Sequence, residues 1–82
     1  MKVAVDISMY PFDPDFVPPI SDVIKRLNAH ENLEIWTNAM STQIVGEFDD
    51  VMNALRQEIG TTFETVPKSV FIIKMFHDPG KM

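Results

Sequence analysis

Residues 33–47 read LEIWTNAMSTQIVGE, and this stretch decides the fold of the chain. Apolar and polar residues alternate on both sides of a turn at residues 38–41, and a period of two is typical of half-buried strands. Because the turn is short, the two strands are predicted to pair as a hairpin with Thr37 opposite Thr42. Both hydroxyls then point to the same face of the sheet.

Helical periodicity flanks this hairpin on both sides. From Pro19 to His30, apolar residues recur every three or four positions, which predicts an amphipathic helix. A second pattern of the same kind begins at Phe48, and Gly60 is a natural stop for it. The prolines around residues 11–17 predict a loop before the first helix.

Two further strands complete the order of elements. Residues 2–10 alternate in polarity, and residues 70–76 are apolar on nearly both faces. The resulting β-α-β-β-α-β order, in a chain of 82 residues, predicts one domain over residues 1–82. Its fold class is α+β, a ferredoxin-like sandwich with two helices on one face of a four-stranded antiparallel sheet.

The last strand predicts which sheet face stays uncovered. Phe71, Ile73 and Met75 are expected to meet the helices. The open face then carries an apolar set of residues, namely Val70, Ile72, Trp36 and Val45. A patch of this kind favours a homo-oligomer, a dimer or tetramer formed by contact between sheets. The alternative is that these are scattered surface residues of the ordinary kind.

Composition and charge exclude several functions. Seven Lys and Arg against twelve Asp and Glu give a net charge of −5, so no nucleic acid and no anionic membrane surface is expected as a partner. The chain has no cysteine, which excludes disulfides and thiolate zinc sites. His30 and His77 have no second ligand at metal spacing, and an exposed or helix-capping role is predicted for both. Without a transmembrane run or an export signal, a cytoplasmic protein is expected.

The hydroxyl-rich turn of the hairpin has two interpretations. Thr37 and Thr42 could form a cross-strand pair that serves the structure alone. They could also line a small polar pocket with aliphatic walls, because a buried hydroxyl without a partner costs about 1–3 kcal/mol. Spacing alone favours the structural interpretation.

Two carboxylates, Glu47 and Asp6, are further candidates for a polar site. Glu47 lies where the third strand meets the second helix, and it is either a solvated first-turn acid or a group that binds an amine. Asp6 lies in the middle of the first strand, where a cross-strand ion pair with Lys74 is the simplest explanation.

Several segments together resemble the thiamine-binding, YkoF-related family. They are Asp6–Pro11, Pro18–Ile20, Thr37–Glu47, Val51–Met52 and Val70–Lys74. The string Met-Ser-Thr-Gln-Ile-Val-Gly-Glu at residues 40–47 is the most distinctive part, whereas the apolar strand patterns are common to many folds. The resemblance extends over residues 2–77.

The resemblance implies a ferredoxin-like fold, oligomers built by sheet stacking, and a site for thiamine or its hydroxymethylpyrimidine part between helices and sheet. Ser41 and Thr42 match the family's ligand-binding hydroxyls, which reverses the balance in favour of a pocket. The ligand-binding residues so predicted are Ser41, Thr42, Thr37, Asn38, Glu47, Ser8 and Tyr10. No catalytic residue, metal or required cofactor is expected.

The sequence is compatible with three functions. The leading hypothesis is a protein that binds thiamine or hydroxymethylpyrimidine without catalysis. The first alternative is a structural or regulatory homo-oligomer without a bound vitamin. The second is an enzyme with Glu47 or Asp6 as a general base, which requires a cleft and a perturbed carboxylate.

Overall fold

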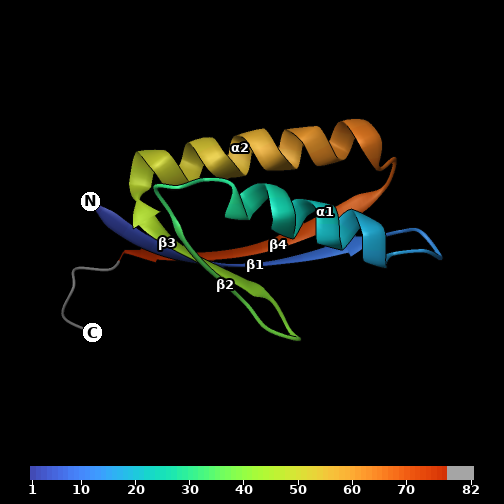
Figure 1. Cartoon of the computed structure of the whole chain (residues 1–82), viewed down its shortest axis with the longest axis horizontal. Coiled ribbons are helices and arrows are strands. Elements are labelled where there is room, and N and C mark those ends of the chain that lie inside the picture. Colours follow the sequence, from blue (N-terminus) through green and yellow to red (C-terminus); the bar gives the residue numbers. More distant parts are fainter. Residues whose placement is uncertain (78–82) are drawn as a thin grey trace.

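The computed structural model describes residues 1–77. Along the chain, its elements are β1 (Lys2–Pro11), α1 (Val17–Asn28), β2 (Glu34–Thr37), β3 (Thr42–Glu47), α2 (Phe48–Thr65) and β4 (Ser69–His77). The strands form one sheet in the order β2-β3-β1-β4, and every neighbouring pair is antiparallel. Both helices lie on the same side of this sheet (Figure 1). This is the predicted ferredoxin-like α+β fold.

The hairpin has the predicted register. Thr37 lies opposite Thr42, and Trp36 lies opposite Gln43. From β3 the alternation passes to β1, where Ile7 lies opposite Thr42. Because directly opposed residues of an antiparallel pair project to the same face, these threonines face the helices together with Ile7.

The core lies between the helices and this face of the sheet. Its most buried members come from every layer of the fold: Leu27 from α1, Val51 from α2 and Ile44 from β3 have exposed fractions of 1%, 0% and 0%. Residues of β1 at every second position complete it, namely Val3, Val5 and Ile7. The apolar residues at every second strand position therefore pack against the apolar faces of the helices in one layer.

The first helix and the loop before it differ slightly from the prediction. The helix covers Val17–Asn28 instead of Pro19–His30, and β1 extends through Pro11, so the loop is confined to residues 12–16. Pro18 is tolerated in the first turn because backbone N–H groups there have no partner within the helix. Pro11 is tolerated because β1 has no β3 partner beyond Ile7, so this part of the strand lies at a sheet edge.

The prediction that Gly60 ends the second helix is wrong. Helix α2 continues to Thr65. A glycine inside a helix costs about 1 kcal/mol relative to alanine, and burial of Thr62, which is 1% exposed, favours continuation. The helix ends where Val66 precedes a proline, and this residue is extended with φ −114° and ψ 107°.

A buried carboxylate joins the two helices. Glu58 of α2 is 4% exposed, and its two oxygens bind different partners from the α1 side. Arg26 Nε donates to Oε1 at 2.8 Å, and His30 Nε2 lies 2.7 Å from Oε2. Arg26 also donates to the hydroxyl of Thr62 at 2.7 Å. His30 is therefore a half-buried bonding partner, which corrects the predicted exposed or capping role.

The face of the sheet opposite the helices is apolar in part, as predicted. Trp36, Val70, Ile72 and Phe76 have exposed fractions of 55%, 42%, 49% and 48%. On the helix side, Ile73 and Met75 also stay 40% and 39% exposed, because β4 is an edge strand. Among residues 1–77, no helix is both long and apolar enough to cross a membrane.

Candidate functional site

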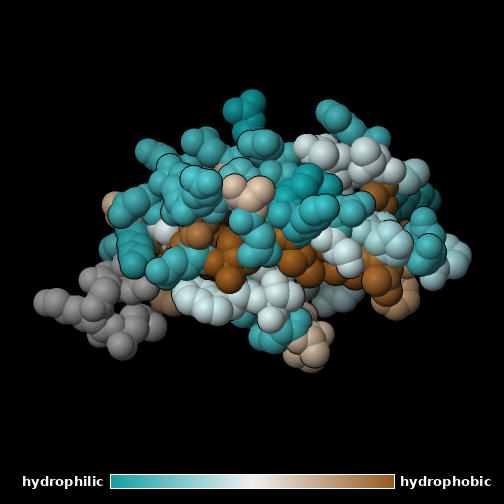
Figure 2. Space-filling model, viewed as in Figure 1, coloured by the Kyte–Doolittle hydropathy of each residue, from teal (hydrophilic) through white to brown (hydrophobic). Residues whose placement is uncertain are grey.

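A cavity of about 480 Å³ opens at the hairpin end of the sandwich. Its walls come from α1, the second half of β1, the loop at residues 12–16, the turn at residues 38–41 and Phe71 of β4. Figure 2 shows apolar side chains exposed along the junction between the helix layer and the sheet. None of the lining residues, all of which belong to the described part of the chain, is an acid, a lysine, an arginine or a histidine.

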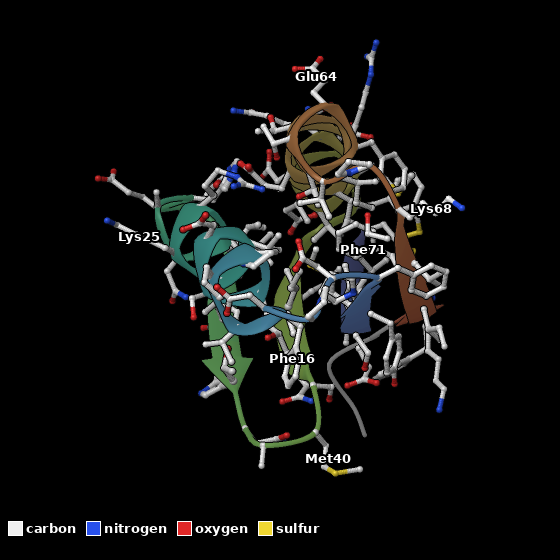
Figure 3. All side chains as sticks on the ribbon, turned by 90° about the vertical axis from the view of Figure 1, so that its right-hand side faces the viewer. Phe16, Lys25, Met40, Glu64, Lys68 and Phe71 are labelled. Atoms are coloured by element: carbon white, nitrogen blue, oxygen red, sulfur yellow. The ribbon has the colours of Figure 1, made fainter. Side chains whose placement is uncertain are left out.

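The cavity has a buried end and an exposed end. Leu27, Ile7 and Thr42 line it with exposed fractions of 1%, 5% and 5%. At the other end, Phe16 and Met40 are 53% and 84% exposed. Figure 3 looks at this end of the molecule, with Phe16 near the start of α1 and Met40 at the tip of the hairpin. A ligand would therefore enter between the 12–16 loop and the hairpin turn.

Two threonines supply the polar group of the buried end. The hydroxyl oxygens of Thr37 and Thr42 lie 3.0 Å apart, and either can donate to the other. A pair of hydroxyls has two protons, and one bond between them uses only one. Among the described residues the second proton has no hydrogen-bond acceptor, so the pair can donate to a ligand. The hydrogen bond between the hydroxyls is the cross-strand pair of the structural interpretation, and a ligand role for them stays a prediction.

Asn38 shapes the turn that carries these hydroxyls. Its side-chain oxygen accepts from the backbone N–H groups of Met40 and Ser41 at 2.7 and 3.0 Å. Its own backbone N–H donates to the Ser41 carbonyl at 3.0 Å. This is the local hydrogen bonding that makes asparagine a turn residue. Asn38 borders the cavity, but its side-chain oxygen is committed to the turn.

The hydroxyl of Ser41 is also committed, on the open face of the sheet. It donates to Asp6 Oδ1 at 2.5 Å, and Gln43 Nε2 donates to the same Asp6 atom at 2.8 Å. Gln43 Nε2 lies 2.8 Å from the Ser41 hydroxyl as well. Ser41 borders the cavity next to Thr42, but its hydroxyl holds the turn against β1.

This network replaces the ion pair that the sequence predicted for Asp6. Lys74 does lie opposite Asp6 in the register of β1 and β4. Hydrogen bonds from Ser41 and then Gln43 hold the pKa of Asp6 below its usual value, and the charge of Lys74 is the smallest cause. The Asp6 carboxylate, together with Ser41 and Gln43, therefore forms a hydrogen-bonded anchor that holds the hairpin to β1.

The anchor predicts how stability responds to acid. Because the folded pKa of Asp6 is lowered, its contribution is present above the usual pKa of aspartate and is lost as pH falls through the folded value. We expect Asp6→Asn to flatten the acid side of a plot of melting temperature against pH relative to the unmodified protein. Parallel slopes for Asp6→Asn and the unmodified protein would refute this assignment.

The remaining predicted residues lie in three different places. Ser8 and Tyr10 border the cavity where β1 runs beyond its last β3 partner, Ile7. By alternation, however, their side chains belong to the open face. Glu47 lies at the other end of β3, where it accepts from the amino-terminal ammonium group at 2.9 Å. The structure does not bring Glu47 to the cavity.

Sequence reasoning missed the aromatic and thioether side chains of the cavity. Phe12, Phe16, Met40 and Phe71 all line it. Phe71 is supported from behind by Phe63 of α2, with ring centroids 5.8 Å apart in an edge-to-face arrangement. The available signal was two exposed phenylalanines in a proline-rich loop, where a purely structural loop needs none.

Comparisons with known proteins agree with this architecture. A Methanocaldococcus jannascii hypothetical protein is 23% identical with a TM-score of 0.83, and the match covers 99% of this chain and 84% of that one. A Thermotoga maritima protein, provisionally described as a thiamine biosynthesis/salvage protein, is 18% identical with a TM-score of 0.86 over 100% and 89% of the two chains. A Bacillus cereus domain of unknown function is 17% identical with a TM-score of 0.75 over 98% and 79%.

These likenesses show the fold, and sequence comparison shows the family. A search of the curated proteins finds no match. Residues 5–82, nearly the whole chain, match the sequence profile of the family described as Thiamine-binding protein. The chain therefore belongs to the thiamine-binding protein family.

Proposed function

We propose that this protein binds thiamine or its hydroxymethylpyrimidine part, without catalysis, in the cavity at the hairpin end. Family membership supports a small-molecule binding role. The choice of ligand rests on one observation: the hydroxyl of Thr42, paired with that of Thr37, lies at the buried end of a cavity whose walls are mostly apolar. A flat aminopyrimidine has a polar edge for this pair and two apolar faces for the surrounding side chains.

Size and charge both suit such a ligand. Ligand cavities generally measure roughly 300–1,000 Å³, and this one measures about 480 Å³. The lining residues carry no side-chain charge that a neutral ring would have to desolvate. Phe71 and Ile24, which both line the cavity, supply apolar contacts for the faces of a ring.

The positions of the two candidate bases favour binding over catalysis. Asp6 accepts hydrogen bonds on the open face, and Glu47 pairs with the amino terminus. Neither carboxylate lines the cavity. A general base must lie within hydrogen-bond reach of the proton that it removes, so neither residue is suited to act on a ring bound there.

A thermal-shift panel tests the proposed function. Thiamine, hydroxymethylpyrimidine and unrelated heterocycles such as nicotinamide are added separately to the protein. A ligand at 100 times its dissociation constant stabilises the folded state by about 2.7 kcal/mol, so one or both pyrimidine compounds should raise the melting temperature and nicotinamide should not. Equal melting temperatures across the panel would favour the structural alternative.

We also propose that the open face of the sheet mediates assembly into a dimer or tetramer. Ile72 and Trp36 lie on this face, and each leaves about half of its surface exposed, 49% and 55%. A neighbouring groove of about 510 Å³ has Trp36, Val45 and Phe76 in its lining, together with the polar side chains of Asp6, Gln43 and Lys74. Contact with a second sheet would remove this apolar surface from water.

Ile72→Glu is expected to dissociate the assembly, because the change places a charge in an apolar contact. Light scattering at micromolar concentration should give a multiple of 9.4 kDa for the unmodified protein and the monomer mass for the variant. Arg56→Glu on α2 is a control on the helix side and should leave the mass unchanged. A monomer mass for the unmodified protein would contradict the proposal.

A further inference from the structure

We propose that the mouth of the cavity selects against phosphate esters, so that the protein takes up unphosphorylated thiamine and rejects its monophosphate. This inference rests on the proposed function and concerns the part of the ligand that extends out of the cavity. It is carried by three features of the mouth: an acidic loop, a helix start with few amide donors, and a lining without cationic side chains.

The orientation of the ligand follows from the gradient of burial. When the Thr37 hydroxyl donates to Thr42 Oγ1, the free proton is that of Thr42, which is 5% exposed at the buried end. A pyrimidine nitrogen is an acceptor for this proton, so the ring occupies the buried end. The substituent of the ring must then extend toward Phe16, which is 53% exposed. In thiamine this substituent is a cationic thiazolium with a hydroxyethyl arm, and phosphate is added to that arm.

The loop at the mouth places negative charge beside this arm. Its sequence is Phe12-Asp13-Pro14-Asp15-Phe16, in which both phenylalanines line the cavity and both aspartates are exposed. The Asp15 N–H donates to Asp13 Oδ1 at 2.9 Å, and the Phe12 N–H donates to the Lys68 carbonyl at 2.8 Å. These bonds stabilise the loop, and its two carboxylates lie in sequence between Phe12 and Phe16, both of which line the cavity. The carboxylates attract a thiazolium and repel a phosphate.

The helix that starts at this loop is a poor anion site. Free N–H groups at a helix start usually favour phosphate, and α1 begins at Val17 directly after Phe16. Pro18 and Pro19 have no N–H, and the Ile20 N–H is directed at the Phe16 carbonyl at 3.5 Å. The first turn therefore has almost no donors to offer a phosphate.

No basic side chain of the cavity lining makes up for the shortage of N–H donors at the start of α1, because none of the lining residues is basic. The basic residue Lys68 is next to the loop, because its backbone carbonyl accepts a hydrogen bond from the Phe12 N–H. Figure 3 shows Lys68 on the β4 side, apart from Phe16 and Met40, between which a ligand would leave the cavity. Among the described residues, a phosphate at the mouth would thus meet the acidic loop and no cationic side chain of the cavity lining.

Calorimetric titration with thiamine and with thiamine monophosphate tests the inference. The unmodified protein is compared with Asp13→Asn/Asp15→Asn and with the control Asp49→Asn/Asp50→Asn. The control removes the same number of charges from the first turn of α2, outside the cavity lining. We expect the unmodified protein and the control to bind thiamine about tenfold more tightly than the monophosphate, a preference typical of a few charges at short range. In the loop variant the ratio should fall to about threefold or less.

The outcomes separate this inference from the proposed function. Equal binding of thiamine and its monophosphate by the unmodified protein would overturn the inference and leave the function standing. An unchanged ratio in the loop variant, or the same reduction in the control, would also overturn it. Binding of neither compound nor of hydroxymethylpyrimidine would overturn the proposed function and the inference with it. A preference that weakens as salt is added would support the electrostatic origin.

Discussion

Thr42→Val is expected to weaken binding of hydroxymethylpyrimidine by about 1–3 kcal/mol, the cost of leaving a buried polar group without its partner. Thr42 is 5% exposed, and its hydroxyl lies 3.0 Å from that of Thr37. Valine has nearly the same volume and a high strand propensity. Thr37 is exposed, so its hydroxyl can turn to water. The melting temperature of the empty protein should stay level or rise.

Calorimetry and thermal unfolding of the same variant distinguish the two roles of this pair. Thr65→Val on α2 is a matched control that removes an exposed hydroxyl outside the cavity lining and should leave affinity unchanged. If Thr42 serves only the structure, the variant will lose stability and keep its affinity. That combination would contradict the ligand role.

Glu58→Ala is expected to lower the free energy of unfolding by about 3 kcal/mol, because breaking a buried ion pair leaves a charged partner without compensation. Glu58 is 4% exposed and accepts hydrogen bonds at 2.8 and 2.7 Å from Arg26 and His30. Arg26 keeps 30% of its side chain exposed, so water recovers part of the loss. The expected value therefore lies at the lower end of the range for buried pairs.

Urea unfolding of Glu58→Ala and of Glu64→Ala measures this difference. Glu64 lies on the same helix, and Figure 3 shows its side chain pointing away from the sheet. Surface substitutions usually change stability by no more than about 0.5 kcal/mol. Equal midpoints for the two variants would show that the Glu58 cluster does not hold the helices together.

The fold could be predicted from the sequence because its signals are local and agree with one another. Alternation on both sides of a short turn determines the hairpin register, so Thr37 was correctly placed opposite Thr42. The helices follow from the spacing of their apolar residues. Gly60 shows where local signals fail, since burial of Thr62, which the sequence alone does not show, carries α2 past it.

The candidate site was harder to predict because its bonds join distant parts of the chain. The Ser41 hydroxyl could be recognised as important, but its partner Asp6 is 35 residues away. Alternation places these consecutive hydroxyls on opposite faces, but it does not show that the one on the open face binds Asp6. Glu47 was grouped with them by sequence proximity, although six residues of extended strand carry it to the far end of β3.

A crystal structure of the protein with hydroxymethylpyrimidine tests the central claim most directly. We predict density for the pyrimidine ring at the buried end of the cavity, with a ring nitrogen or amino group within hydrogen-bond distance of the Thr42 hydroxyl. The ring faces should contact apolar residues such as Phe71. An empty cavity in crystals grown with saturating compound, or a ring bound elsewhere on the molecule, would contradict the account.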